Sequence, residues 1–284
     1  MSRIEQALEK AAQKRGQQAP AQSPPPRQER PLILTEPVMK RAEAPPETNH
    51  ENPLLVMIND AASPIAEEYR KLKAVVSQLT KSDSFQNTLL VTSAIPNEGK
   101  SVTALNLAVC LAQELDHTVL LVDADLRRPS VHRYLDLENG PGLTQCLAQG
   151  EDIATAIVPT AIDKLSVVRA GNSTENPVEL FSSQRMRDLV QELKTRYHDR
   201  YVIFDSPPVL PFAEARTLAQ LVDGVIMVVK EGYTPLTNIQ DAISSLAGTN
   251  MLGIVYNDAE IVKFDERYKY YHNYYYQKQG NRAA

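Results

Sequence analysis

The chain has 284 residues, a hydrophobic fraction of 43% and a formal net charge of −5 at pH 7. This acidic balance argues against a broad basic surface, so we expect no nucleic-acid partner. The two cysteines, Cys110 and Cys146, lie too far apart in sequence for a CxxC metal or iron–sulfur site, and such sparse use of cysteine favours a reducing, cytoplasmic compartment.

Two appendages are predicted before the folded domain. Apolar residues at helical spacing predict a short helix over residues 1–15, which is either a frayed terminal helix or a docking helix for a partner. Residues 16–53 contain nine of the 19 prolines, and proline fixes φ and removes a backbone donor, so we predict a flexible linker there. No run in the chain approaches the roughly 18–20 apolar residues that span a bilayer, and no membrane span is expected.

Residues 54–262 show the pattern of one α/β domain. Ser63 and Pro64 predict a helix start, because serine caps a helix and proline fits its first turn. The helix should run to Thr80 with an apolar stripe toward the core. The stripe consists of Ile65, Leu72, Val75, Val76 and Leu79.

Short apolar segments then alternate with amphipathic ones. Strands are predicted at Thr88–Ser93, Thr118–Asp123, Leu165–Arg169, Tyr201–Asp205, Gly224–Val229 and Gly253–Tyr256, and helices near 100–114, 142–148, 178–197, 213–221 and 236–247. This alternation predicts a three-layer, doubly wound α/β fold, in which helices cover both faces of a mostly parallel sheet.

The loop after the first strand ends in Gly99-Lys100-Ser101 and leads into an apolar helix. Such a loop turns backbone N–H groups toward phosphates at a helix N-terminus. Lys100, expected to be an exposed loop charge, would reach the β- and γ-phosphates of a nucleotide, and the Ser101 hydroxyl would ligate Mg²⁺. Ala94 stands where the first glycine of such loops is usual. The predicted nucleotide-binding residues here are Pro96, Asn97, Glu98, Gly99, Lys100, Ser101 and Val102.

Acidic residues end two later strands. Asp123 and Asp125 follow one apolar strand, and alternation along an extended segment predicts that they point to the same side. Asp205 ends another apolar strand, as in a Walker B element that holds Mg²⁺ directly or through water. Ligands collect at the carboxyl ends of strands in open α/β sheets, so these carboxylates are candidates for a site. Arg127 and Arg128 are either surface charges or help to neutralise phosphate.

Together these motifs resemble the bacterial tyrosine kinases of polysaccharide export, or BY-kinases, which are P-loop NTPases of the deviant Walker (MinD/ParA-like) class. The resemblance rests on the GKS loop at 99–101, a DxDxR element at 123–127 and a DxPP element at 205–208. Residues 176–183 are similar to the family's NPxELLSS segment, and residues 67–73 to its ExxRxxR oligomerisation motif, with Lys73 where arginine is usual. The opening residues 1–11 resemble soluble members of the exosortase-associated subgroup.

The resemblance implies an ATP- and Mg²⁺-dependent protein-tyrosine kinase. It implies that Asp123 accepts the tyrosine proton and stays ionised near neutral pH, with Lys100 and Mg²⁺ close by. It also implies that Asp125 and Asp205 hold Mg²⁺ with Ser101. Asn257, after the last strand, is a candidate contact for the nucleotide base, although an asparagine there is commonly a turn residue.

The same resemblance implies partners. The chain would form a homo-oligomer, such as a ring, through Glu67, Arg70 and Lys73. A membrane polysaccharide co-polymerase would activate it at the inner face of the cell membrane, and a protein-tyrosine phosphatase would reverse its phosphorylation.

The C-terminal residues 263–284 are predicted to be a flexible tail that holds a tyrosine cluster. The cluster is either a set of phosphoacceptors, like the C-terminal cluster of the family, or a set of interface aromatics. Its members, six of the 12 tyrosines, are Tyr268, Tyr270, Tyr271, Tyr274, Tyr275 and Tyr276.

The main alternative is a MinD- or ParA-like ATPase switch without kinase activity. Those proteins usually carry a lysine early in the phosphate loop, and residues 94–99 contain none. A non-catalytic scaffold of the same fold is the other alternative, against which the intact Lys100, Ser101 and three aspartates argue.

Overall fold

The computed structural model describes residues 52–81, 85–196 and 199–259, which all belong to one compact unit. The predicted helix at 1–15, almost all of the predicted linker and the predicted tail lie outside the described residues. Within the described segments, none of the helices is both long and apolar enough to cross a membrane.

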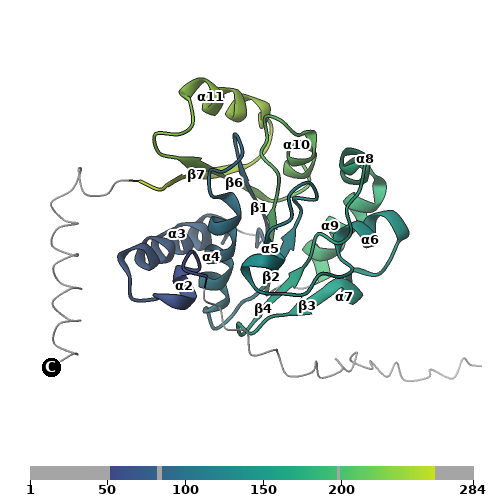
Figure 1. The fold of residues 1–284 in the computed structure, drawn as a ribbon, viewed down its shortest axis with the longest axis horizontal. Helices are drawn as coiled ribbons and strands as arrows, with labels where there is room; N and C mark the ends of the chain where they lie inside the picture. Colours follow the sequence, from purple (N-terminus) through teal and green to yellow (C-terminus); the bar gives the residue numbers. More distant parts are fainter. Residues whose placement is uncertain (1–51, 82–84, 197–198, 260–284) are drawn as a thin grey trace, which may run out of the picture. The chain divides into compact units, whose positions relative to one another are not determined.

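In the part of the chain that the structure describes, a seven-stranded sheet forms the centre (Figure 1). Its strands are β1 (Thr88–Ser93), β2 (Thr118–Asp123), β3 (Ile157–Pro159), β4 (Leu165–Val168), β5 (Arg200–Asp205), β6 (Gly224–Lys230) and β7 (Met251–Asn257). Their order is β3-β4-β2-β5-β1-β6-β7, and all neighbours are parallel except β3 and β4. The carboxyl ends of β2, β5 and β1 are therefore adjacent.

Helices cover both faces of this sheet. They are α2 (Val56–Asn59), α3 (Pro64–Thr80), α4 (Lys100–Ala112), α5 (Val131–Tyr134), α6 (Leu143–Gln149), α7 (Ile153–Ala156), α8 (Pro177–Ser182), α9 (Gln184–Arg196), α10 (Ala213–Ala219) and α11 (Leu236–Ser245). Successive strand residues such as Leu89 and Leu90 belong to two separate core clusters. Helices α2–α5 contribute to one cluster and α6–α11 to the other (Figure 1). The predicted three-layer α/β fold is confirmed.

The predicted helix at 178–197 is in fact two helices, α8 and α9, which are separated at Ser183. The backbone of Ser183 is extended, with φ −69° and ψ 158°. Its hydroxyl donates to the Leu180 carbonyl at 2.7 Å and accepts the Met186 N–H at 3.2 Å. The Ser183 hydroxyl thus replaces backbone hydrogen bonds at the end of α8 and the start of α9, which allows the helix to break there. The short elements α2, α5, α7 and β3 escape prediction because three or four residues show no clear periodicity.

Helix α3 begins and ends where the sequence predicts, and the Ser63 hydroxyl accepts the Ala66 N–H at 3.1 Å. The predicted apolar stripe is partly wrong, because Ile65, Val75 and Leu79 are 54%, 52% and 44% exposed. The face of α3 that packs on the core, against α4, is instead a mixture of apolar and hydroxyl side chains. The buried residues of α3 are Ala66, Tyr69, Val76, Ser77 and Thr80.

Candidate active site

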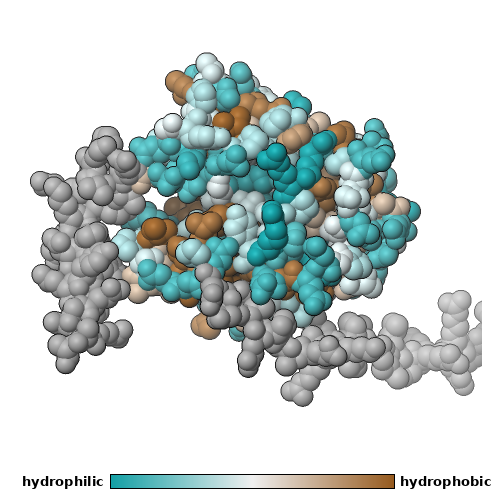
Figure 2. All heavy atoms as spheres, in the orientation of Figure 1, coloured by the Kyte–Doolittle hydropathy of each residue, from teal (hydrophilic) through white to brown (hydrophobic). Residues whose placement is uncertain are grey.

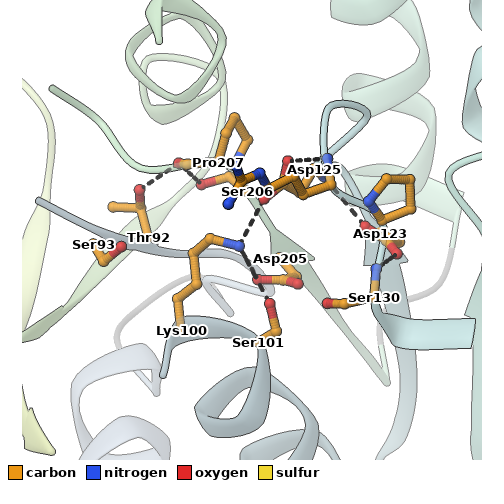
Figure 3. A network of polar contacts seen from close by, with 12 residues as sticks. Thr92, Ser93, Lys100, Ser101, Asp123, Asp125, Ser130, Asp205, Ser206 and Pro207 are labelled. Atoms are coloured by element: carbon orange, nitrogen blue, oxygen red, sulfur yellow. Dashed lines mark hydrogen bonds and ion pairs between the residues drawn. The ribbon is translucent and has the colours of Figure 1, made fainter. Parts of the chain in front are cut away.

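Polar side chains converge where β1, β5 and β2 end (Figure 3). Lys100 and Ser101 begin α4 after the loop that follows β1. Asp205 ends β5 and Asp123 ends β2, with Asp125 two residues further along. These five residues are among the predicted site residues, and the fold brings them together because their strands are neighbours.

The phosphate loop turns through two residues in the left-handed region, Asn97 with φ 67° and Gly99 with φ 92°. A Cβ added at Gly99 would lie 2.1 Å from Asn257 Nδ2, so glycine is required both for its φ and for close approach. Asn257 donates from Nδ2 to the Glu98 carbonyl at 2.8 Å. In this structure the predicted base contact, Asn257, supports the loop backbone.

Lys100 is enclosed, and the expectation of an exposed loop charge is wrong. Its side chain is 11% exposed, and Nζ lies 2.8 Å from Asp125 Oδ2 and 3.7 Å from Asp205 Oδ1. The Ser101 hydroxyl lies 3.2 Å from the same nitrogen. Burial acts to lower the pKa of Lys100, but the two carboxylates outweigh it and the pKa is raised. The positive charge of the Lys100 amine thus partly offsets the negative charges of Asp125 and Asp205.

The carboxyl group of Asp205 fits an Mg²⁺ ligand. It is fully buried, and among the described residues neither of its oxygens has a hydrogen-bond partner. Burial raises the pKa of Asp205, and Lys100 opposes this rise. No group of three or more His, Cys, Asp or Glu within the described ranges has metal-binding geometry. Mg²⁺ suits such a place, because it is usually held by one or two carboxylates together with water and phosphate oxygens.

Asp123 lies behind this cluster and is fully buried. Its Oδ2 accepts the N–H groups of Ser130 and Val131 at 3.0 and 3.1 Å, and its Oδ1 accepts that of Asp125 at 3.3 Å. Burial, with Asp205 nearby, raises the pKa of Asp123 to about 8 despite these bonds. Protein groups alone thus favour the protonated form of Asp123, and Lys100 bonds Asp125 instead. The expected ionisation of Asp123 near neutral pH with Mg²⁺ close by stays a prediction.

This raised pKa predicts how stability depends on pH without metal. The folded chain holds the Asp123 proton more tightly than the unfolded chain, so the stabilisation is complete below the unfolded pKa of 3.8 and is lost as pH rises through about 8. The melting temperature without Mg²⁺ or nucleotide should therefore fall from about pH 5 to about pH 9, and fall less in Asp123→Asn. Thermal melts followed by circular dichroism check this, and parallel curves for both proteins would contradict it.

The polar cluster opens into a hollow of about 510 Å³, which we call the nucleotide hollow. Asp125 and six predicted nucleotide-binding residues line it, whereas Glu98 and Asn257 are not among its lining residues. The six are Pro96, Asn97, Gly99, Lys100, Ser101 and Val102. Arg128, Arg133 and Phe212 also line the hollow. No local sequence pattern predicts Arg133 or Phe212 as a site residue, because only the fold brings them to the hollow.

The two arginines after β2 have different surroundings. Arg127 Nε donates to Glu214 Oε1 at 2.7 Å, and its guanidinium carbon lies 4.5 Å from the centroid of the Phe212 ring. Glu214 is 1% exposed, so Arg127 fastens this loop to α10, and it is not among the residues that line the nucleotide hollow. Arg128 lines the nucleotide hollow, where its charge is available to phosphate.

Glu98 fastens the phosphate loop from behind. Its carboxylate is fully buried, accepts the Ile95 N–H at 2.7 Å and the Lys230 N–H at 3.4 Å, and also accepts the hydroxyl of Thr234. The sequence places Glu98 in the phosphate loop but gives no sign of Lys230 and Thr234 as partners, which follow it by more than 130 positions.

Glu98→Ala should therefore destabilise the chain by about 1–3 kcal/mol, because it leaves a buried N–H without an acceptor. Nucleotide affinity should fall with it, since the loop loses its attachment to the segment after β6. Thr234→Val is the matched control, which removes one partner only and should cost about 0.5–1.5 kcal/mol. Urea unfolding and a fluorescent-nucleotide titration measure both effects. Equal stability of Glu98→Ala and wild type would contradict the role.

The predicted oligomerisation residues are paired within the chain. Arg70 Nη1 lies 2.9 Å from Glu67 Oε2, with side chains 37% and 39% exposed. Lys73 Nζ lies 3.5 Å from Glu114 Oε1, in the segment after α4. The tyrosines at 268–276 lie outside the described residues.

Comparison with known proteins gives consistent relatives. The ParA family, described as NUBPL iron-transfer P-loop NTPase, matches residues 84–284. Tyrosine-protein kinase YwqD of Bacillus subtilis is 36% identical over 219 residues, 76% of this chain and 90% of that protein. Tyrosine-protein kinase ptk of Acinetobacter johnsonii is 31% identical over 68% of this chain but only 26% of its own length. The kinase domain of Escherichia coli tyrosine kinase ETK has a TM-score of 0.66 and 27% identity, covering 74% of this chain and 84% of that one.

The iron transfer in the ParA description has no counterpart in the cysteines of this chain. Cys110 and Cys146 are both buried and belong to different core clusters on opposite faces of the sheet. Membership of the exosortase-associated subgroup stays a prediction. The sheet, the phosphate loop, the aspartates and the relatives agree, and the chain belongs to the bacterial tyrosine kinases, a family of ParA-like P-loop proteins.

Proposed function

We propose that the chain is an ATP-dependent autokinase that phosphorylates its own tail tyrosines. The main support is the position of Lys100 between Asp125 and Asp205 at the wall of the nucleotide hollow. The proposed phosphoacceptors are Tyr268, Tyr270, Tyr271, Tyr274, Tyr275 and Tyr276.

In the proposed transfer, a bond forms between the tyrosine oxygen and the γ-phosphorus while the bond from that phosphorus to the β–γ bridging oxygen breaks. The tyrosine proton passes to an aspartate, and ADP leaves. Lys100 and the loop N–H groups stabilise the charge that spreads over the phosphoryl oxygens, which is often the largest catalytic contribution. Mg²⁺, when bound by Ser101, Asp125 and Asp205, would supply further positive charge to the phosphates.

Two aspartates compete for the role of base. Asp123 is the proposed base, but three backbone N–H groups enclose its carboxylate and it is not among the residues that line the nucleotide hollow. For Asp123 to act, the segment at Ser130 and Val131 must release one of its oxygens. Asp125 already lines the hollow, yet it is the partner of Lys100 and a proposed metal ligand.

We further propose that the tail enters the site of a neighbouring copy in an oligomer built through α3. Glu67 and Arg70 are half exposed on this helix, and Ile65, Val75 and Leu79 leave apolar surface on it. Each tail phosphate adds about −1.5 to −2 charges, so several on adjacent tyrosines should repel one another and the acidic cluster, expel the tail and loosen the oligomer.

Arg70→Ala should therefore give a smaller species than unphosphorylated wild type in light scattering. The matched control is Lys71→Ala, since Lys71 also makes an i,i+3 ion pair on α3, with Glu68 at 2.7 Å. Exposed pairs contribute only about 0–1 kcal/mol, so neither change should unfold the chain. Equal masses for both variants and wild type would count against this interface.

Membrane and regulatory partners complete the proposal. The Acinetobacter kinase is much longer than this chain. We propose that here a separate membrane polysaccharide co-polymerase supplies the activating segment, that a protein-tyrosine phosphatase resets the tail, and that this cycle regulates exopolysaccharide polymerisation and export. Addition of the cytoplasmic segment of such a co-polymerase should raise the phosphorylation rate.

The test of the function is incubation of the purified full chain with Mg-ATP, followed by phosphotyrosine mapping by mass spectrometry. Phosphotyrosine at residues 268–276 would support the autokinase. ATP hydrolysis without phosphotyrosine would overturn it in favour of an ATPase switch like MinD or ParA.

A further inference from the structure

A second hollow of about 640 Å³ lies beside the nucleotide hollow and takes no part in the proposed transfer. Arg128 and Arg133 line both, so the two hollows share a wall. Arg169, which follows β4, lines only the second one, as do His132 and Asn172. We call this space the arginine hollow.

The arginine hollow is electropositive. Its lining contains three arginines, and none of the described residues that line it is acidic. Burial lowers the pKa of His132, and the charges of Arg133 and Arg169 lower it further. Figure 2 shows strongly hydrophilic residues gathered on this face of the molecule around α5, the helix that carries His132 and Arg133.

The guanidinium of Arg169 is held in place with a donor to spare. Its Nη1 donates to the Glu138 carbonyl at 2.6 Å, while its Nε is buried and has no partner among the described residues. A Cβ added at Gly140 would lie 2.7 Å from Nη2. The guanidinium therefore packs against the Gly140 backbone in a space that a larger residue would occupy. A buried donor without an acceptor is costly, and charge-assisted bonds to an anion are the strongest that a guanidinium makes.

We propose that the arginine hollow binds phosphotyrosine from an already phosphorylated tail and so keeps that tail beside the active site while another of its tyrosines is phosphorylated. Planar guanidinium groups suit a phosphate monoester, and the space has room for the ring that carries it. The proposal rests on the proposed autokinase function.

The location and the tail sequence both fit this role. The acidic cluster around Asp125 and Asp205 repels a new phosphate, whereas the arginines next to it attract one. Six tyrosines lie within residues 268–276, each extended residue spanning roughly 3.3–3.6 Å, so a modified and an unmodified tyrosine of one tail are never far apart.

Binding is tested with the dephosphorylated full chain, without nucleotide, and a synthetic peptide of residues 264–280 that carries phosphotyrosine at position 271. The phosphopeptide should bind at least about tenfold more tightly than the unmodified peptide. Arg169→Gln should remove most of this preference. Asn172→Asp should do the same with little effect on folding, because Asn172 is exposed and the change is isosteric.

The control is Arg187→Gln, which removes an exposed arginine of α9 that does not line the hollow and should keep the preference. Wild type without a preference, or a preference unchanged in both Arg169→Gln and Asn172→Asp, would overturn the proposal.

Intact-mass spectra during phosphorylation give a second readout. Wild type should accumulate multiply phosphorylated chains while unmodified chains remain. Asn172→Asp should add its first phosphate at the wild-type rate, but each later phosphate should be added independently of those already present, so singly phosphorylated chains should accumulate first. A chain that never becomes phosphorylated would refute the autokinase, while the peptide titration would still decide whether the arginine hollow binds phosphotyrosine.

Discussion

Lys100→Met is expected to lower ATP-dependent tyrosine phosphorylation by at least about 100- to 1,000-fold, because it removes a preorganised positive charge from the phosphoryl site. The same change should also destabilise the nucleotide-free chain. Lys100 Nζ lies between Asp125 and Asp205, and their carboxylates would lose their nearby cation. Breaking a buried ion pair from one side costs about 3–5 kcal/mol, an upper limit here because the carboxylates can take up protons.

The loss of stability should grow as the pH rises. Without Lys100, the burial that raises the pKa of Asp205 loses its main opposing charge, so the folded chain would hold this proton more tightly still and lose stability as the proton leaves. The control is Lys100→Arg, which keeps the charge and should recover stability more than activity. Phosphotyrosine immunoblots and thermal melts at several pH values measure the two effects. A Lys100→Met variant with wild-type labelling would refute the assignment of the loop.

The sheet and the phosphate loop follow from local sequence. The bounds of β1 and β2 agree with the predicted Thr88–Ser93 and Thr118–Asp123, because a short continuous apolar run between polar residues is typical of a strand buried on both faces. The GKS residues and Asp205 were recognisable because spacing in the chain defines the loop and a strand end defines the acid. Parallel neighbours then place both at one end of the sheet.

The rest of the site depends on contacts between distant segments. No local pattern links Glu98 to Thr234, Arg127 to Glu214 or Arg169 to the region of α5. The same reason explains other features that local sequence does not predict. The burial of Lys100 and the raised pKa of Asp123 depend on how closely three strand ends pack, and the exposed stripe on α3 depends on which of its faces fits α4.

Asp205→Asn should weaken nucleotide binding at least about tenfold when Mg²⁺ is present and much less when it is absent. The reason is that, among the described residues, the two buried oxygens of Asp205 accept no hydrogen bond and have only the ion pair with Lys100 at 3.7 Å, so they are free to ligate a metal. Asp123→Asn should leave Mg-nucleotide binding nearly unchanged, because its carboxylate faces backbone N–H groups behind the hollow. Isothermal titration of both variants, with and without Mg²⁺, measures this difference.

Asp123→Asn should nevertheless lower phosphorylation at saturating Mg-ATP by about 10²–10⁴-fold if Asp123 is the base. The wild-type rate should then rise with pH over the range in which Asp123 loses its proton, and this rise should be absent from the residual activity of Asp123→Asn. Asp125→Asn is the comparison, since Asp125 lines the hollow and bonds Lys100, so its loss should weaken binding as well as turnover. If Asp125→Asn binds Mg-nucleotide normally and abolishes the pH-dependent rise while Asp123→Asn keeps it, Asp125 is the base. Equal loss of nucleotide affinity in Asp123→Asn and Asp205→Asn would refute the division between base and metal ligand. Both aspartates would then contribute to nucleotide binding, whereas a base is needed only in the transfer step.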